Sequence, residues 1–523
     1  TINAGGAVTQ SSGALLKTSD GTLSVNATGG ITLTNSNLSA DVALTNTTSG
    51  DITYSTGISS LNISASNVSS GDILLENTAG TLTVTNASTG TGAIMLSGSG
   101  DLALGVASTT GAVNVASTGG AILDNNSSAL NISGGTVTLS AYNGIETDVN
   151  ATTFVSATTT TNNINLEATD GNLPIGVIST PWSATLKTSV GAITDANAGS
   201  LNITANSLVL NSYTAIGALL DPLEMNISNL SAVSSGGSGV FLGNSGDLNI
   251  SGVTASGNLL LTNSGTLSLS GAVSGSNIDL VTDISFTSSG GSISASGRWL
   301  VWSVNPSLDT RGALSHDFKQ YNATYGTTTV LGTGNGFLYS IAPVISAGLT
   351  GSVSKTYDGT DVATLTSGNY TLSGAIDGDT VVLNNPTAGT YDNKNAVSGK
   401  TVSVSGISVT SATDTGAKPV YGYSVNSAAS DTIGVISRRD LSGTISTGTT
   451  TYGDSLIPGT ASFDNAVAGD ILVPTTSVNT TGLTSTSGHL IAGTHTGIQY
   501  ISVLNGADAG NYTYANVKGN YSV

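Results

Sequence analysis

The chain has 523 residues, of which 68 are glycine, none is cysteine, and 12 are basic against 31 acidic. A disulfide scaffold and a zinc site built on thiolates are therefore excluded. The net charge of −19 argues against nucleic acid as a partner, because a phosphate-binding surface needs clustered Lys and Arg. Helix formers are scarce while β-branched and turn-forming residues dominate, which predicts an all-β fold. No apolar run approaches the roughly 18 residues of a membrane span, so we expect no membrane insertion.

The composition changes along the chain. Residues 1–297 hold two basic residues against 17 acidic ones, a net charge of −15, whereas residues 298–523 hold 10 against 14, a net charge of −4. Seven aromatic residues lie before position 298 and 18 lie after it. Such a shift marks a boundary between two architectures near Gly297.

Residues 1–297 form a repeat. Short strands recur, many opened by glycine and a small or acidic residue, and the glycines Gly30, Gly50, Gly71, Gly92 and Gly111 are spaced by 20, 21, 21 and 19 residues. A period near 20 is typical of a β-solenoid, in which each strand pairs in parallel with its copy one coil on. Stacking of about 15 coils would bury inward Val, Leu and Ile, and would leave ladders of Thr, Ser and Asn on the outside.

Three phrases between residues 190 and 300 carry a family resemblance. They are Gly191-Ala192-Ile193-Thr194-Asp195, Ala215-Ile216-Gly217-Ala218-Leu219-Leu220-Asp221-Pro222-Leu223-Glu224-Met225-Asn226-Ile227, and Gly246-Asp247-Leu248-Asn249-Ile250. They resemble recurrent signatures of filamentous-haemagglutinin-like exoproteins, which are large bacterial adhesins. The resemblance implies a right-handed parallel β-helix exported by two-partner secretion, and hence an outer-membrane secretion partner. Because the chain opens in what looks like the middle of a repeat, we expect a processed protein or a fragment of a longer one.

Large rings gather where the repeat ends. Arg298-Trp299-Leu300-Val301-Trp302-Ser303 breaks the small-residue pattern, and further aromatic residues follow soon after. We interpret residues 298–343 as a cap, since an uncovered coil end is an open sheet edge that invites aggregation. The alternative is that Trp299 or Trp302 binds a ligand by stacking on a sugar ring. Strand alternation places the two indoles on opposite faces, which weakens a shared platform.

Two small modules follow residue 343. Lys355-Thr356-Tyr357-Asp358-Gly359 and Tyr391-Asp392-Asn393-Lys394 resemble the YDG module of large bacterial surface proteins. Thr451-Tyr452-Gly453-Asp454-Ser455 and Asp508-Ala509-Gly510-Asn511-Tyr512 resemble the related MBG module. We assign residues 344–436 and 437–523 to two β-sandwich-like domains of alternating strands. Within them, four residues have two possible roles: they either form turns beside an aromatic ring that anchors the turn, or they bind a ligand. These residues are Tyr357, Asp358, Tyr452 and Asp454.

Catalysis is not expected of this chain. Residues 1–297 contain no Arg, no His and two Lys, so the usual base of a polysaccharide lyase is scarce. A glycoside hydrolase needs two carboxylates about 5–10 Å apart, and 17 acidic residues could supply such a pair. Several of these carboxylates, however, directly follow a turn glycine, where corner chemistry is the simpler explanation: Asp51, Asp72, Asp101 and Asp247.

No cofactor is expected either. Asp377 and Asp379 are the pair that would offer oxygen ligands to Ca²⁺. An ordinary hairpin turn is the favoured interpretation of that stretch, since nothing like the calcium-binding glycine-aspartate repeat is present.

The sequence supports two functional hypotheses. The first is a secreted or cell-surface bacterial adhesin, whose rigid solenoid serves attachment, aggregation or binding of the carbohydrate of a biofilm matrix. Many weak contacts along such a surface add up through multivalency. The alternative is a self-assembling extracellular structural filament, whose partner is another copy of the chain.

Overall fold

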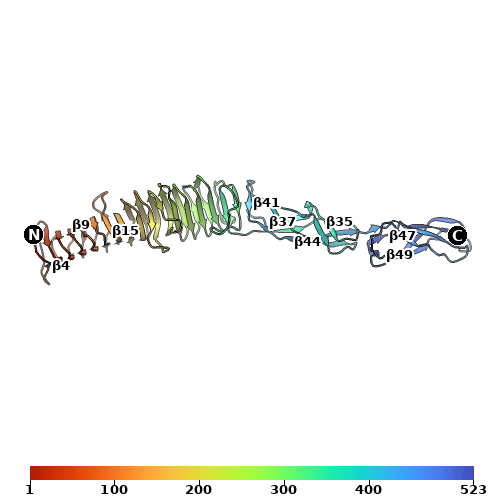
Figure 1. Ribbon diagram of the computed structural model, residues 1–523, viewed down its shortest axis with the longest axis horizontal. Coiled ribbons are helices and arrows are strands. Elements are labelled where there is room, and N and C mark those ends of the chain that lie inside the picture. Colours follow the sequence, from red (N-terminus) through yellow and green to blue (C-terminus); the bar gives the residue numbers. More distant parts are fainter. The chain divides into compact units, whose positions relative to one another are not determined.

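The computed structural model describes residues 1–523 and is all-β, with 54% strand and 2% helix. It divides into two compact units, Thr1–Ile341 and Ala342–Val523, which are described separately. The first unit is a parallel β-solenoid of about 16 turns, confirming the predicted architecture (Figure 1). Its handedness stays a prediction from the family resemblance. No helix is long and apolar enough to cross a membrane.

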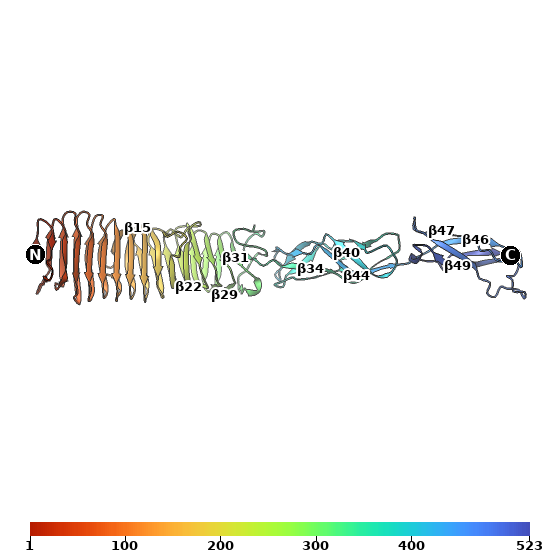
Figure 2. The same cartoon turned by 90° about the horizontal axis from the view of Figure 1, so that it is seen from below.

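The strands of the solenoid stack in parallel columns, and Figure 2 shows them as successive rungs. Two columns of the early coils illustrate the register. One holds β3 (Leu23–Ala27), β5 (Asp41–Asn46), β7 (Ser60–Asn67), β9 (Thr81–Ser88) and β11 (Leu102–Ser108). The other holds β4 (Ile31–Asn37), β6 (Ile52–Thr56), β8 (Ile73–Asn77), β10 (Ile94–Gly98) and β12 (Ala112–Ser117).

Alternation along each strand builds the core. In β8 and β10 the pairs Ile73–Ile94 and Leu75–Leu96 face inward, and all four side chains are at most 2% exposed. Because each inward side chain lies on its counterpart one coil away, one coil cannot bury its apolar face alone. The predicted inward Val, Leu and Ile are confirmed.

Glycine and aspartate shape the corners between strands. A Cβ on Gly71 would lie 2.1 Å from the carbonyl oxygen of Gly50, and one on Gly92 would lie 2.1 Å from that of Gly71. Consecutive corners therefore approach more closely than any side chain allows, which explains the glycine period. The aspartate that follows binds the next coil: Asp72 Oδ1 accepts the backbone N–H of Ala93 at 2.7 Å. Asp51, Asp101 and Asp247 accept in the same way, so the corner interpretation of these carboxylates is confirmed.

Part of the expected outer ladder lies inside the solenoid. Asn46 and Asn67 end consecutive strands of one column and are 0% and 2% exposed. Asn46 donates to Asn67 Oδ1 at 3.3 Å, and Asn67 donates to the carbonyl oxygen of Gly50 at 2.8 Å. The prediction that asparagines face outward is therefore wrong at these positions. Corner carbonyls that no strand can pair need an internal donor, and the asparagine amides supply it.

Parallel stacking continues past Gly297. Strand β31 (Trp299–Ser303) pairs with β28 (Ile278–Thr282), and β33 (Gly336–Tyr339) pairs with β31. The core then changes from aliphatic to aromatic: Trp299 meets Phe337 edge-on at 5.3 Å, and Phe337 lies 6.2 Å from Phe286. Residues after Gly297 thus add rungs and fill the last coils with rings.

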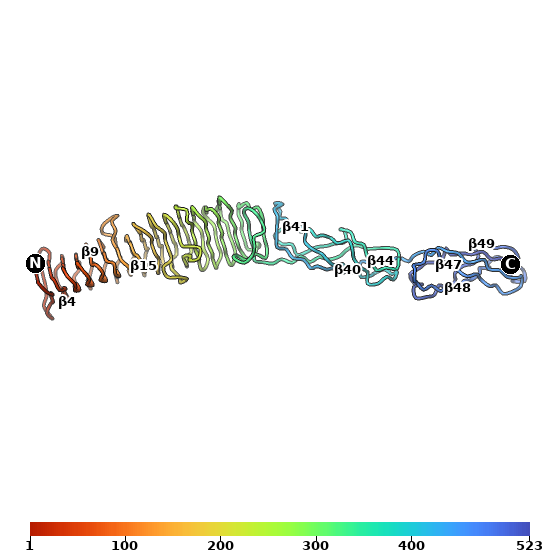
Figure 3. Tube along the Cα trace, in the orientation of Figure 1, coloured from red at the N-terminus to blue at the C-terminus, as the bar shows by residue number.

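The second unit consists of two modules of short mixed sheets, traced in Figure 3. The first module contains a five-stranded sheet in the order β35-β44-β40-β39-β36, and the second contains one in the order β47-β46-β51-β49-β48. Strands of the first module are β34 (Val344–Leu349), β35 (Val353–Thr356), β36 (Val362–Thr364), β37 (Tyr370–Ser373), β38 (Thr380–Leu383), β39 (Ala388–Tyr391), β40 (Ser398–Ser405), β41 (Val409–Thr413), β42 (Val420–Tyr421), β43 (Ser424–Val425) and β44 (Ala428–Ser437). Those of the second are β45 (Arg439–Asp440), β46 (Gly443–Thr449), β47 (Ala461–Phe463), β48 (Val473–Val478), β49 (Thr494–Asn505), β50 (Tyr512–Thr513) and β51 (Lys518–Ser522).

Candidate functional site

A groove of about 860 Å³ runs along the outer face of the last solenoid coils and is the candidate site. Its floor is one column of outward-facing positions in register, one from each of five consecutive rungs, and the Gly243 position carries no side chain. They lie on β22 (Leu223–Ser234), β23 (Gly239–Asn244), β25 (Leu259–Asn263), β28 and β31, and are Glu224, Gly243, Thr262, Val281 and Trp302. At about 4.8 Å per rung, the floor is about 19 Å long.

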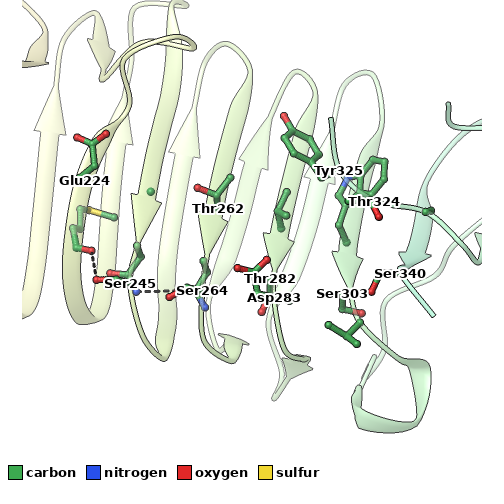
Figure 4. Close-up of a pocket in the computed structure, with 18 of the residues that line it drawn as sticks. Glu224, Ser245, Thr262, Ser264, Thr282, Asp283, Ser303, Thr324, Tyr325 and Ser340 are labelled. Carbon is green, nitrogen blue, oxygen red and sulfur yellow. Dashed lines mark hydrogen bonds between the residues drawn. The ribbon is translucent and has the colours of Figure 1, made fainter. Parts of the chain in front are cut away.

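The sides of the groove are rich in hydroxyl groups. Figure 4 shows Ser245, Ser264 and Asp283 along one side, at the ends of successive strands. The strand-end residues beside them turn inward and fix the corners: Asn244 donates to Asn263 Oδ1 at 2.9 Å, and both are buried. Inward amides thus hold the corners, while the next residue of each corner faces the groove.

An aromatic pair closes one end. Tyr325 and Trp302 meet edge to face at 5.4 Å, and the Trp302 Nε1–H donates to Asp279 Oδ1 at 3.0 Å. Burial raises the pKa of Asp279, although the bond from Trp302 opposes that shift. Burial and the nearby Asp279 carboxylate also raise the pKa of Tyr325. The half-buried Tyr325 ring, rather than Trp302, is therefore the aromatic surface that a bound molecule would reach.

A carboxylate lies at the other end, as Figure 4 shows for Glu224. Its backbone N–H donates to Asn202 Oδ1 at 2.9 Å, while its Oε2 atom is buried and has no hydrogen-bond partner. Burial raises the pKa of Glu224, and the carboxylates of Asp195 and Asp221 raise it further. Glu224 therefore keeps one buried carboxylate oxygen without a hydrogen-bond donor at this end of the groove.

The support beneath Glu224 occurs twice in the solenoid. Residues 192–204 repeat residues 121–133 with an offset of 71, so that Asp195, Asn197 and Asn202 match Asp124, Asn126 and Asn131. Asn202 donates to Asp195 Oδ1 at 2.7 Å, and the matching Asn131 donates to Asp124 Oδ1 at 2.8 Å. The glycine period does not reveal this duplication, whereas the shared phrases Ala-Ile-x-Asp-x-Asn and Leu-Asn-Ile do.

The first copy of this motif supports a smaller groove. The asparagine of that copy, Asn131, accepts the backbone N–H of Asp148 at 2.8 Å, as Asn202 does for Glu224. This second groove has a volume of about 420 Å³, and in it Asp148 pairs in register with Glu167. Lys187 Nζ bridges Glu167 Oε1 at 2.7 Å. Because the cation already occupies this carboxylate column, the larger groove is the better candidate site.

The two indoles singled out from the sequence occupy different places. Trp299 faces the core and is 3% exposed, whereas Trp302 faces the larger groove and is 5% exposed. The prediction that they lie on opposite strand faces is confirmed. Neither presents an open ring face, which fits the capping interpretation.

The four module residues lie in the loops that follow β35 and β46. Tyr357 is fully buried, and Asp358 accepts bonds from Lys355 Nζ at 2.8 Å and from the N–H of Thr360 at 2.9 Å. Burial raises the pKa of Asp358, but these hydrogen bonds outweigh burial and hold that pKa below its usual range. Tyr452 is 48% exposed, and its hydroxyl lies 2.8 Å from Ser485 Oγ. Asp454 is exposed and donates its N–H to the carbonyl oxygen of Thr451 at 3.1 Å.

The Asp377 and Asp379 stretch is also a turn. Asp379 donates its N–H to the carbonyl oxygen of Ile376 at 3.0 Å, and Asp377 has a φ of 55°. Asp379 Oδ2 accepts the Tyr423 hydroxyl at 3.0 Å. No group of three or more His, Asp or Glu side chains in the chain is arranged to hold a metal ion.

Comparison with known proteins identifies one part of the chain. A family described as the YDG domain matches residues 340–430, which confirms the resemblance of the first module. No curated protein and no solved structure matches the chain. The YDG domain and the rigid β-solenoid together fit an extracellular adhesin-like protein.

Proposed function

We propose that the chain is part of a secreted or cell-surface bacterial adhesin whose solenoid groove binds a carbohydrate chain, such as the exopolysaccharide of a biofilm matrix. The observation that carries this proposal is the column from Glu224 to Trp302, in which five consecutive rungs form one floor. A floor about 19 Å long fits an extended polymer better than a compact small molecule. Export by two-partner secretion is part of the proposal and rests on the family resemblance.

The side chains of the groove suit sugar hydroxyls. Thr262 and Ser264 offer hydroxyl groups, Tyr325 offers a ring edge or face, and the Glu224 side chain lines the far end of the groove. Asp283 adds a carboxylate at the side. An acidic groove on a solenoid of net charge −15 over residues 1–297 repels uronic acids and other polyanions. We therefore expect a neutral or amino-sugar polymer.

A blocking variant tests the groove directly. Thr262→Trp adds a large ring to the middle of the floor, and Thr53→Trp adds the same ring to an outward position of β6 far from the groove. On a glycan array and in a pull-down with matrix polysaccharide, we expect Thr262→Trp to lose at least about tenfold in binding, which is about 1.4 kcal/mol. Thr53→Trp should bind like the unmodified chain. Absence of binding by the unmodified chain in both assays, or equal binding by both variants, would refute the carbohydrate proposal.

A second candidate function is self-assembly into a structural filament. It is favoured by an apolar corner on the solenoid, where Leu219 is 60% and Leu220 is 96% exposed. Exposed adjacent leucines are the kind of surface that protein contacts use. Negative-stain images at micromolar concentration distinguish the two functions, since long uniform fibres favour assembly and separate particles favour adhesion.

A further inference from the structure

Side chains from both modules of the second unit meet at one joint. Tyr357 and Lys394 come from the first module, and Asp470, Asp508 and Tyr512 come from the second. The hydroxyls of Tyr357 and Tyr512 both donate to Asp470 Oδ2, at 2.8 and 2.7 Å. Lys394 Nζ lies 3.2 Å from Asp470 Oδ1 and 3.0 Å from Asp508 Oδ1. One carboxylate thus receives three donors, two of which belong to the other module.

The joint is closely packed. Tyr357 is 0% exposed, Tyr512 is 2% exposed, and their rings meet edge to face at 5.4 Å. A Cβ on Gly359 would lie 2.5 Å from Val467 Cγ1, so only glycine lets the modules approach this closely. A buried carboxylate is stable only when it is fully hydrogen-bonded, and the first module supplies the missing donors. Burial and the bond to Asp470 raise the pKa of Tyr512 to about 12, which keeps its hydroxyl a donor.

The aspartate and tyrosine on the second module's side of the joint form an arrangement that is found in both modules. In the second module Tyr512 Oη accepts the Val467 N–H at 2.9 Å and donates to Asp470. In the first module Tyr423 Oη accepts the Ile376 N–H at 3.0 Å and donates to Asp379 at 3.0 Å. The same three-residue arrangement therefore occurs in both modules. What the docking adds is the pair Tyr357 and Lys394.

The tyrosine that donates across the joint, Tyr357, has a counterpart in the second module that makes different contacts. Tyr452 stands in the Tyr-Gly-Asp motif of the second module, where Tyr357 stands in the Tyr-Asp-Gly motif of the first. The hydroxyl of Tyr452 lies 2.8 Å from both Ser485 Oγ and Ser487 Oγ of its own module, and its ring is 48% exposed. A tyrosine in this motif can therefore be satisfied within its own module, without docking to another module. The additional residue that accompanies docking in the first module is Lys394.

We propose that the Tyr-Asp-Gly signature, together with Lys394, is a docking element that recognises the aspartate–tyrosine end of the module that follows. The partner it fits is a β module presenting a buried aspartate already bridged by a tyrosine. Gly359 permits the approach, Tyr357 and Lys394 satisfy the aspartate, and Asn511 Oδ1 accepts the Ala396 N–H across the joint at 2.7 Å. The residues that characterise the first module therefore also determine which kind of module can follow it.

Hydrogen exchange on the full chain tests the docking element. The amide of Ala396 reports on the joint, because its acceptor lies in the other module. In Lys394→Met and in Tyr357→Phe we expect the exchange rate of this amide to rise about tenfold, as loss of one charged or buried hydrogen bond predicts. Amides of β40, in the core of the first module, should keep their protection. The matched control is Tyr452→Phe, which removes the same hydroxyl from the other motif and should leave Ala396 unchanged.

Nitration of tyrosine gives a second measurement. Tetranitromethane should modify Tyr452 in the unmodified chain but reach Tyr357 only after Lys394→Met opens the joint. If Lys394→Met also speeds exchange in β40, it disturbs the core of the first module. Tyr357→Phe then provides the test of the joint, because it keeps the buried ring and removes only the hydroxyl. Unchanged exchange at Ala396 in both joint variants, or an equal rise in Tyr452→Phe, would overturn the proposal.

Discussion

Gly71 and Gly92 at the coil corners are glycines because consecutive coils approach closely there, not because of their backbone conformation. Gly71 does not have a positive φ, yet a Cβ at this position would lie 2.1 Å from the Gly50 carbonyl oxygen. The Gly71 carbonyl oxygen also accepts a hydrogen bond from the Thr89 hydroxyl at 2.8 Å. Any Cβ would push the corner away from that donor.

Gly71→Ala should therefore destabilise the solenoid by about 1–3 kcal/mol, the usual range for overpacking. Thermal unfolding followed by circular dichroism measures the effect. Gly199→Ala is the matched control, since a Cβ on Gly199 meets nothing within 4 Å. Equal stability of the two variants would show that the corners relax without loss.

The protonation of Glu224 makes the stability of the solenoid depend on pH. Its pKa is raised by burial and by Asp195 and Asp221, so the folded chain holds the proton more tightly than the unfolded chain does. The stabilisation that accompanies protonation is complete below the unfolded pKa of about 4.3 and is lost as pH rises through the folded pKa. At about pH 7 the folded chain therefore carries the unfavourable buried charge.

Glu224→Gln should accordingly raise the unfolding temperature at about pH 7, and its advantage should shrink as pH falls below about 4.3. Calorimetry at the two pH values measures this difference. Asp20→Asn, which changes an exposed carboxylate early in the solenoid, is the control for general charge effects. A constant advantage at both pH values would contradict the role of the charge.

Among the elements, the aromatic end of the solenoid decides how the stack is closed. The Phe337 ring lies 5.3 Å from the Trp299 ring and 6.2 Å from the Phe286 ring, and these rings replace the aliphatic core of the earlier coils. Rings cover more apolar area than Val or Leu, which suits the last few rungs of the stack.

Truncation of this core should be severe and local. Trp299→Ala removes a 3%-exposed indole and should destabilise the last coils by about 3–5 kcal/mol, seen as faster hydrogen exchange in β28 and β31. Trp182→Ala is the comparison, because Trp182 lies on the same solenoid but is 61% exposed. Loss of protection spread evenly over all coils, or none at all, would argue against a closing role.

Much of the architecture follows from the sequence because its signals are periodic. Glycines about 20 residues apart and alternating Val, Leu and Ile predict the coils, and aspartates after glycine predict the corners. Buried asparagines such as Asn67 escape this reasoning, because composition cannot tell an inner amide from an outer one. The joint escapes it for another reason: Tyr357 meets Asp470 across 113 positions, a separation no local pattern encodes. The groove likewise depends on how far each rung advances, which sets the column from Glu224 to Trp302.

For the whole molecule, charge is the property that acts at the longest range. The sequence carries a net charge of −19 and has an isoelectric point near 4.1, with most of the excess in residues 1–297. At neutral pH copies of the chain repel one another, and the repulsion disappears near the isoelectric point. Short-range apolar contacts, if the chain has a surface for them, then become visible.

Sedimentation at about pH 7 and at about pH 4.1 can therefore show whether the exposed Leu219 and Leu220 corner drives self-assembly. We expect separate chains at the higher pH and association at the lower, because removal of net charge leaves the apolar corner unopposed. Leu220→Ser should reduce the association, since Leu220 is 96% exposed, whereas Val68→Ser, at a 66%-exposed position elsewhere on the solenoid, should not. Equal association of both variants would mean that charge loss alone drives it. Separate chains throughout would remove the support for the filament function and leave the groove as the surface on which function depends.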